Sequence, residues 1–352
     1  MIHNKHDWLV SLLREEIRKS GKVLDSEQSS KIIGDVIQRI VPEFSEILLK
    51  SLKSKMATAL EESRLCQSQF EERLLKRWKK PIDLMEFFLI LCQEAGSEFN
   101  DKYRTEAGRT HDYVFGVLTR LHARGCQIVC EMLTLLKGGL ADGAHARWRT
   151  LHEIAAVSFF IRDHGPQVAE RYLHYETVET YKEALEYQKH CRELGDEPLT
   201  EKELETIKKR HDQALNIYGE DFGDEYGWIP KDILKNRNFS EIEKSAKIDR
   251  LRPYYKWACH NVHSGPKSLA SRLGLIKTNE NPIILAGRSN YGLADPGQGA
   301  AISLCQITVC LLSTRPTIEN LVVIKTIEKL VDEINPAFCD VQKEIEKEER
   351  AK

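Results

Sequence analysis

Apolar residues recur at helical spacing along almost the whole chain. Residues 5–20 and 26–41 each carry a row of leucine, isoleucine and valine at intervals of three or four residues, which is typical of an amphipathic helix. The same spacing continues in further segments that we expect to be helical: 43–79, 81–96, 112–137, 140–161, 168–194, 198–218 and 317–335. The pattern therefore predicts an all-α protein built as a multi-helix bundle.

Proline and glycine mark where helices are expected to end or begin. Pro42 should end the helix over 26–41, because its ring nitrogen has no hydrogen to donate to the preceding turn. Asp295-Pro296 has the order of a cap followed by a first-turn proline, so a helix should begin there. Glycine, proline and asparagine are densest over 278–299, around the short apolar run PIILAG. An irregular loop or a short strand pair is therefore predicted near residues 278–299.

The polarity of the chain predicts its division into parts. Residues 97–110 are polar and contain glycine, which indicates a soft boundary. We therefore expect an N-terminal helical module over 1–100 and a helical core domain with the candidate site over 110–335. Residues 336–352 end in KEIEKEERAK, a charged tail that we expect to fray.

Composition narrows the class of protein. The 52 basic and 54 acidic side chains give a net charge of −2, so no global positive charge attracts nucleic acid. Nine cysteines without CxxC spacing indicate reduced thiols rather than disulfides or a zinc ribbon. The N-terminus does not read as a signal peptide, and the apolar runs are too short to cross a bilayer. We expect a soluble cytoplasmic protein with no membrane partner, whose N-terminal helices bind a protein partner or a second copy of the chain.

The stretch HARWRTLHE, residues 145–153, concentrates cationic groups in an apolar surrounding. On a helix, His145, Arg149 and His152 share one face, because they are spaced i, i+4 and i+7. Arg147 is turned about 140° away from His152. Three interpretations stay open: a core salt-bridge network in which Glu153 or a carboxylate of the next helix pairs with arginine, a site for phosphate or another anion, and an exposed face.

A second cluster follows in WACHNVHSGP, residues 257–266. His260 and His263 are neighbours at the end of an expected helix, and Asn261 and Ser264 add polar groups. The pair could cap the helix, bind or activate a substrate, or hold a metal, although no second cluster of ligands accompanies it. Arg171, one turn before His174, either extends the cationic face or belongs to a solvated helix. No cofactor is implied by any motif.

Two resemblances follow from these residues. The segment GGLADGAHARWRTLHEIAAVSFFIRDHGPQVAERYLHYE, with the later CHNVHSGP, resembles a family of uncharacterised bacterial proteins over about residues 110–315. That family has no established activity. The run from Arg147 to His152 is also similar to the Arg-x4–6-His motif of the HEPN superfamily, all-helical proteins of which many are metal-independent ribonucleases of phage-defence and toxin systems. The resemblance implies RNA as a partner, a histidine acting on the ribose 2′-hydroxyl and an arginine stabilising charge on phosphate.

The function expected from the sequence is therefore RNA cleavage in a bacterial defence or toxin system. The predicted catalytic residues are Arg147, Arg149, His152 and His263. The predicted substrate-binding residues are His145, Glu153, Arg171, His260, Asn261 and Ser264. Two alternatives stay open: a non-catalytic helical interaction or sensor protein in which these groups are structural, and a metal-dependent enzyme that uses the histidine pair.

Overall fold

The computed structural model describes residue 18 and residues 26–270, 272–276 and 285–351. These residues form helices and connecting loops without a strand, which confirms the all-α prediction. The chain divides into two units, Met1–Glu72 and Arg73–Lys352. Except for Arg18, the helix predicted over 5–20 lies outside the described residues. No helix in the described part is both long enough and apolar enough to cross a membrane.

The first unit holds α2 (Ser26–Ser54) and most of α3 (Met56–Arg77). Pro42 lies inside α2, so the prediction that it ends a helix was wrong. A proline removes one backbone hydrogen bond and kinks the helix, but the turns on either side can continue. Gln38, whose carbonyl loses its partner, is exposed to water, which reduces the cost of the missing bond.

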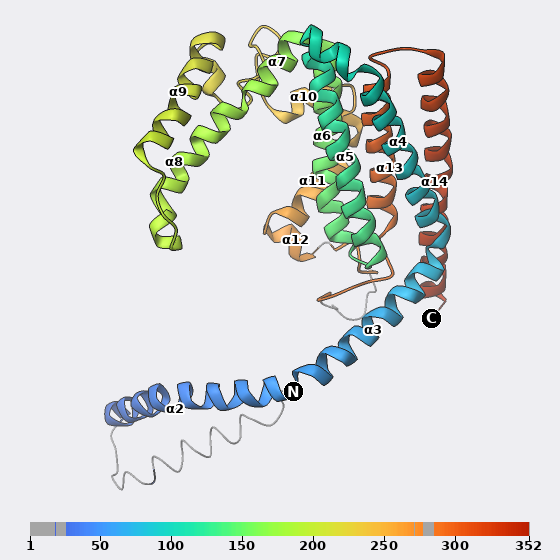
Figure 1. The fold of residues 1–352 in the computed structure, drawn as a ribbon. Helices are drawn as coiled ribbons and strands as arrows, with labels where there is room; N and C mark the ends of the chain where they lie inside the picture. The colour runs from blue at the N-terminus through green and yellow to red at the C-terminus, as the bar shows by residue number, and fades with distance from the viewer. Residues whose placement is uncertain (1–17, 19–25, 271, 277–284, 352) are drawn as a thin grey trace. The chain divides into compact units, whose positions relative to one another are not determined.

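The second unit is a helical bundle in which α13 is the central helix. α13 (Ala294–Leu312) packs against α4 (Lys79–Thr110), α5 (Tyr113–Lys137), α6 (Ala141–His164) and α14 (Ile318–Arg350), as Figure 1 shows. α6 also packs against α10 (Phe239–Ser245) and α11 (Arg252–Val262). Helices on several sides therefore enclose α6, the helix that carries HARWRTLHE.

The remaining elements connect this bundle. They are α7 (Pro166–His174), α8 (Glu176–Leu194), α9 (Glu201–Tyr218), η1 (Glu220–Gly223), η2 (Asp249–Leu251) and α12 (Pro266–Ala270). α8 and α9 pack on each other beside α7 (Figure 1). The single helix predicted over 168–194 is thus two helices. They separate at Tyr175, whose hydroxyl donates to the carbonyl of Asp224 over 2.5 Å and so binds the chain to a distant loop.

Side-chain caps fix where several helices begin. Asp112 accepts a hydrogen bond from the backbone N–H of Phe115 at 2.9 Å, and Thr317 accepts one from Asn320 at 3.2 Å. Such caps satisfy N–H groups that have no partner inside the helix. Asp112 also pairs with Arg315 at 2.7 Å, which joins the start of α5 to the segment after α13.

Three boundaries differ from the sequence-based expectation. Residues 97–110 belong to α4, so no loop separates the parts there. Residues 336–350 continue α14, and Phe338 and Ile345 are buried, so this segment packs instead of fraying. Residues 285–293 contain no strand; Ser289 donates its N–H to the carbonyl of Gly139 at 2.9 Å, which ties this irregular loop to the end of α5. Residues 278–284 of the predicted strand pair lie outside the described residues.

A histidine lies at the centre of the bundle. The Nε2 atom of His122 is 3.1 Å from the hydroxyl of Thr308, and burial lowers the pKa of His122 to about 4. The imidazole has room because residue 96 is glycine: a Cβ atom there would lie 2.3 Å from Cε1 of His122. The buried imidazole of His122 is therefore neutral at pH 7 and lies within hydrogen-bond distance of Thr308.

Candidate functional site

His152 lies in a closed network of side chains. Its Nε2 atom is 2.8 Å from Oε1 of Glu243 in α10, and both side chains are 0% exposed. The other oxygen of Glu243 binds Arg252 of α11. Because an ionised carboxylate only accepts hydrogen bonds, the pairing places the proton of the imidazole on Nε2. Its Nδ1 atom is buried without a hydrogen-bond partner in the described part of the chain.

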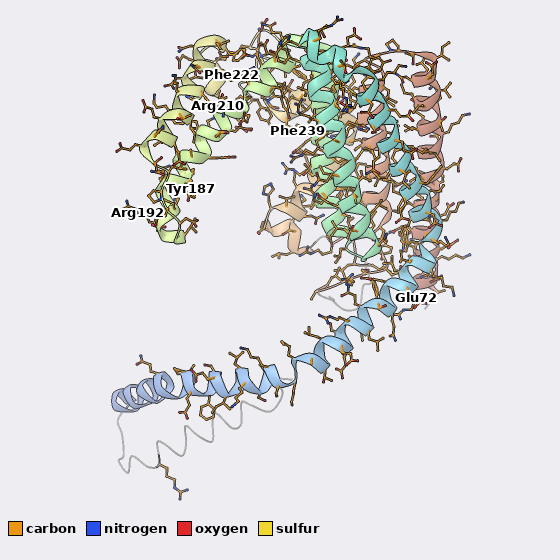
Figure 2. The ribbon with its side chains drawn as sticks, in the orientation of Figure 1. Glu72, Tyr187, Arg192, Arg210, Phe222 and Phe239 are labelled. Atoms are coloured by element: carbon orange, nitrogen blue, oxygen red, sulfur yellow. The ribbon has the colours of Figure 1, made fainter. Side chains whose placement is uncertain are left out.

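Aromatic rings cover the imidazole of His152. The Trp148 ring stacks on it with centroids 5.3 Å apart, and Phe239 meets it edge-on at 6.1 Å. Tyr255 lies at 5.8 Å. Phe239, at the start of α10, is labelled in Figure 2. The described structure therefore gives His152 no opening to solvent.

Arg149 and Glu153 form a second network on the same face of α6. Nη2 of Arg149 is 3.0 Å from Oε1 of Glu153 and donates to the hydroxyl of Tyr255 at 3.1 Å. The Tyr255 hydroxyl in turn donates to Glu153 at 2.6 Å. Burial and then the hydrogen bond to Glu153 raise the pKa of Tyr255, so the phenol keeps its proton. These contacts match the salt-bridge interpretation of HARWRTLHE.

Arg147 points to a different neighbour. Its Nε atom is 2.6 Å from Oε2 of Glu131 in α5. His152 comes five positions after Arg147, so at about 100° per residue the two side chains leave α6 in directions about 140° apart. The structure therefore pairs the arginine and the histidine of the Arg-x4-His motif with two different helices.

The second cluster reaches α6 through Asn261. Its Nδ2 donates to Nδ1 of His145 at 3.2 Å, while Tyr255 of the same helix contacts His152, so α11 runs antiparallel to α6. His263 directly follows Val262, the last residue of α11, about two helical turns beyond Tyr255 and away from His152. The structure does not bring His152 and His263 together.

The other members of WACHNVHSGP also stay apart from His152. His263 and Ser264 are exposed, and His260 is half-buried. Within the described residues, no group of three or more histidine, cysteine, aspartate or glutamate side chains could hold a metal ion. In the described part, the histidine pair therefore has no third ligand of these types.

Arg171 lies in another part of the second unit. Its guanidinium donates to the backbone carbonyls of Trp228, Tyr218 and Gly227 at 3.1, 3.2 and 2.8 Å. The rings of Tyr218 and Phe222 lie 5.2 and 5.1 Å from its Cζ atom, and Figure 2 labels Phe222. Arg171 is 7% exposed, so its donors hold the loop after α9 and are not available to a substrate.

A cavity of about 210 Å³ lies beside α6 at His145 and Trp148. It is bordered by α6, α11, α13 and α14. Its lining residues are His145, Trp148, Leu251, Tyr254, Asp295, Gln298, Gly299, Ile302 and Asn335. Burial lowers the pKa of His145 to about 4, so this imidazole is neutral at pH 7. Burial raises the pKa of Asp295 above its ordinary value of 3.8. The Oδ1 atom of Asn335 is buried and has no hydrogen-bond partner in the described residues.

His145 is the one predicted site residue that lines this cavity. Sequence reasoning missed Asp295, Gln298 and Asn335. Asp295 stood out only as a helix start, and Asn335 did not stand out at all. A helix-start signal does not indicate which other helices pack around Asp295.

Comparison with known proteins adds one finding. Residues 115–282 match a family of unknown function, DUF5677. No curated protein and no solved structure matches the chain. The match confirms the resemblance to a family without established activity, whereas the HEPN resemblance stays a hypothesis.

The DUF5677 region contains only part of the candidate site. It begins in α5 and includes α6, α10 and α11, and therefore the contacts of His152, Arg149 and Asn261. Asp295, Gln298 and Asn335 follow it in the chain. The cavity is therefore built from the DUF5677 region together with α13 and α14.

Gly299 allows α13 to approach α6 at the cavity wall. A Cβ atom at this position would lie 2.7 Å from Nε1 of Trp148, which donates to Ser303 at 3.0 Å. We expect Gly299→Ala to destabilise the protein by about 1–3 kcal/mol, because the stacked indole cannot move aside. Equilibrium unfolding in urea measures the change.

Gly108→Ala is the matched control. Gly108 is also helical, and a Cβ atom there meets nothing within 4 Å. Alanine at that position should stabilise the helix by about 0.5–1 kcal/mol. Equal changes in the two variants would contradict the close packing of Gly299 on Trp148.

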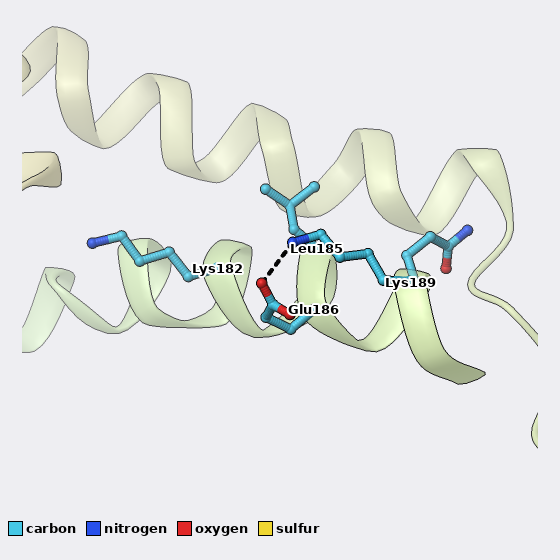
Figure 3. Close-up of a pocket in the computed structure, with 5 residues that line it drawn as sticks. Lys182, Leu185, Glu186 and Lys189 are labelled. Atoms are coloured by element: carbon cyan, nitrogen blue, oxygen red, sulfur yellow. Dashed lines mark hydrogen bonds and ion pairs between the residues drawn. The ribbon is translucent and has the colours of Figure 1, made fainter. Parts of the chain in front are cut away.

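A second hollow lies on the surface of α8. Figure 3 shows its residues Lys182, Leu185, Glu186, Gln188 and Lys189, all from this one helix. Lys189 pairs with Glu186 at 2.6 Å, and Lys182 donates to the carbonyl of Gly223 at 2.8 Å. Its charged groups are therefore satisfied within the protein, unlike the acceptors of the cavity beside α6.

Proposed function

We propose that this protein is a non-catalytic helical binding or sensor protein, in which the arginine and histidine clusters hold the core together. The observation that carries this proposal is the complete enclosure of His152 and Glu243. A general acid or base must come within hydrogen-bond reach of the proton that it transfers. The imidazole of His152 is bonded to Glu243 and covered by aromatic rings instead.

The placement of the other predicted catalytic groups supports the same function. Arg147 pairs with Glu131, Arg149 pairs with Glu153, and His263 is exposed at the end of α11. A ribonuclease needs such groups to converge on one phosphodiester. Each of them has its own surroundings here.

The first unit supports a role in binding. Val41, Ile47, Leu49, Met56 and Leu65 are each about half exposed on α2 and α3. Exposed apolar side chains on two consecutive helices fit a contact with another protein. A protein partner or a second copy of the chain would cover them.

Incubation with labelled RNA tests the non-catalytic proposal. We expect no cleavage by the purified wild type, with magnesium or with a chelator, above the level of buffer alone. Arg147→Ala and His263→Ala are suitable variants for comparison, because both side chains are at least partly exposed and their loss leaves the core intact.

RNA cleavage by the wild type that Arg147→Ala abolishes would overturn the proposal. The thermal unfolding temperature of each variant must match that of the wild type, so that loss of activity is not loss of fold. Such a result would restore the ribonuclease hypothesis and would require His152 to become accessible during the reaction.

A further inference from the structure

The geometry points to the cavity beside α6 as a binding site for a small organic cation that carries N–H donors, a primary amine or a guanidinium. Its polar lining includes the carboxylate of Asp295 and the carboxamide oxygen of Asn335, and neither has a hydrogen-bond partner within the described residues. This role deepens the proposed binding function and rests on it, since the cavity would hold the ligand without converting it.

Asp295 is a partly buried carboxylate in the cavity wall. In the described residues it makes no hydrogen bond and no ion pair, and burial alone raises its pKa. Asp295 lies in the first turn of α13, where the helix dipole stabilises a negative charge in part. The next residue is Pro296, which has no N–H to offer. A ligand cation would supply the missing charge.

The other polar atoms in the cavity also require donors. Gln298 uses its Nε2 on the carbonyl of Asn335 at 3.0 Å and on the sulfur of Cys339 at 3.2 Å. The amide of Gln298 therefore does not donate to Oδ1 of Asn335. That oxygen is buried and accepts no hydrogen bond in the described part of the chain. A ligand that donates to this buried acceptor removes the energetic cost of leaving it without a hydrogen bond.

His145 does not oppose a cation in this cavity. Its Nδ1 accepts from Asn261, which places the proton on Nε2, and burial keeps the ring neutral at pH 7. Tyr254, 42% exposed at the rim, offers an aromatic ring of the kind that attracts cations. An anion would meet the carboxylate of Asp295 and is therefore disfavoured.

The size of the cavity limits the ligand. Sites for drug-sized molecules have volumes of about 300–1,000 Å³, whereas this cavity has about 210 Å³. Leu251 and Ile302 add apolar wall. A single metal ion would leave most of this space and wall unused, so an organic cation with a short carbon chain fits better.

Binding of putrescine and agmatine to the full chain, measured by isothermal titration calorimetry, tests this assignment. 1,4-Butanediol has the length of putrescine without its charge and is the matched neutral probe. We expect both cations to bind and the diol to bind at least about tenfold more weakly. Calcium and magnesium chloride are tested in parallel, because oxygen ligands also suit these ions.

Asp295→Asn and Asn335→Ala are the variants for the same titrations. Asp295→Asn keeps the shape of the side chain and should weaken putrescine at least about tenfold. Asp332→Asn changes an exposed carboxylate outside the cavity lining and should leave binding unchanged. The thermal unfolding temperature of unliganded Asp295→Asn should equal or exceed that of the wild type, because a desolvated charge is removed, which shows that the variant folds.

Three results would each overturn the assignment: binding of neither cation, equal binding of the diol, or cation binding that Asp295→Asn leaves unchanged. Binding of calcium or magnesium alone, lost in Asp295→Asn, would overturn it in favour of a metal site. These outcomes are separate from the RNA assay. A chain that binds no probe and cleaves no RNA overturns only the cation site, whereas RNA cleavage that Arg147→Ala abolishes overturns the proposed function.

Discussion

Replacing His152 by alanine is expected to destabilise the protein by about 3–5 kcal/mol. The substitution removes an enclosed ring from between Trp148, Phe239 and Tyr255 and leaves a cavity. It also leaves Glu243 buried with one partner, Arg252, where the native protein has two. Removing one partner of a buried carboxylate lowers stability by more than the net contribution of the hydrogen bond, because the carboxylate oxygen stays buried without a donor.

Equilibrium unfolding in urea, followed by circular dichroism, measures this loss. His263→Ala is the matched control, since its exposed imidazole should change stability by less than about 0.5 kcal/mol. Glu243→Gln keeps the shape of the partner and should have a smaller effect than His152→Ala. If His152→Ala proved as stable as His263→Ala, the structural role of this network would be wrong.

Arg171→Met is expected to destabilise the protein by about 2–5 kcal/mol. Methionine keeps most of the apolar volume but removes all three hydrogen bonds to the carbonyls of Tyr218, Gly227 and Trp228. Those carbonyls, which accept from a charged donor in the native protein, would lose that partner. Lysine would not replace arginine, because a single ammonium group cannot reproduce the planar fork of donors.

Hydrogen exchange of the backbone amides identifies where the energy is lost. We expect faster exchange over residues 218–228 in Arg171→Met, together with a lower unfolding midpoint. Arg192→Met is the control, because Arg192 is exposed in α8, where Figure 2 labels it. Unchanged exchange in the loop would mean that Arg171 does not hold it in place.

Periodicity predicted most helices but not all of their ends. Pro42 and Pro336 both lie inside helices, because a helix that continues on both sides can absorb one missing hydrogen bond. The division at Tyr175 has no proline or glycine to mark it. The residue at the division, Tyr175, donates a hydrogen bond to the carbonyl of Asp224, a contact that local sequence does not reveal.

From the sequence, only the placement of side chains around a single helix, α6, could be predicted for the candidate site. The sequence placed His145, Arg149 and His152 on one face and Arg147 on another, because about 100° per residue is a property of any α-helix. The contacts agree: Arg147 meets α5, whereas Arg149 and His152 meet α11 and α10.

Only the tertiary structure showed which residues these α6 side chains contact. Glu243 is 91 residues from His152, and Asp295 and Asn335 meet at a cavity that His145 reaches from a third helix. Spacing along the chain fixes which side chains share a helix face, but packing between helices decides which faces meet and which groups lose water. The sequence alone therefore determined an all-α chain with a polar face on α6. The tertiary structure decided that His152 is closed off and that the acceptors beside His145 are left without donors in the described part of the chain.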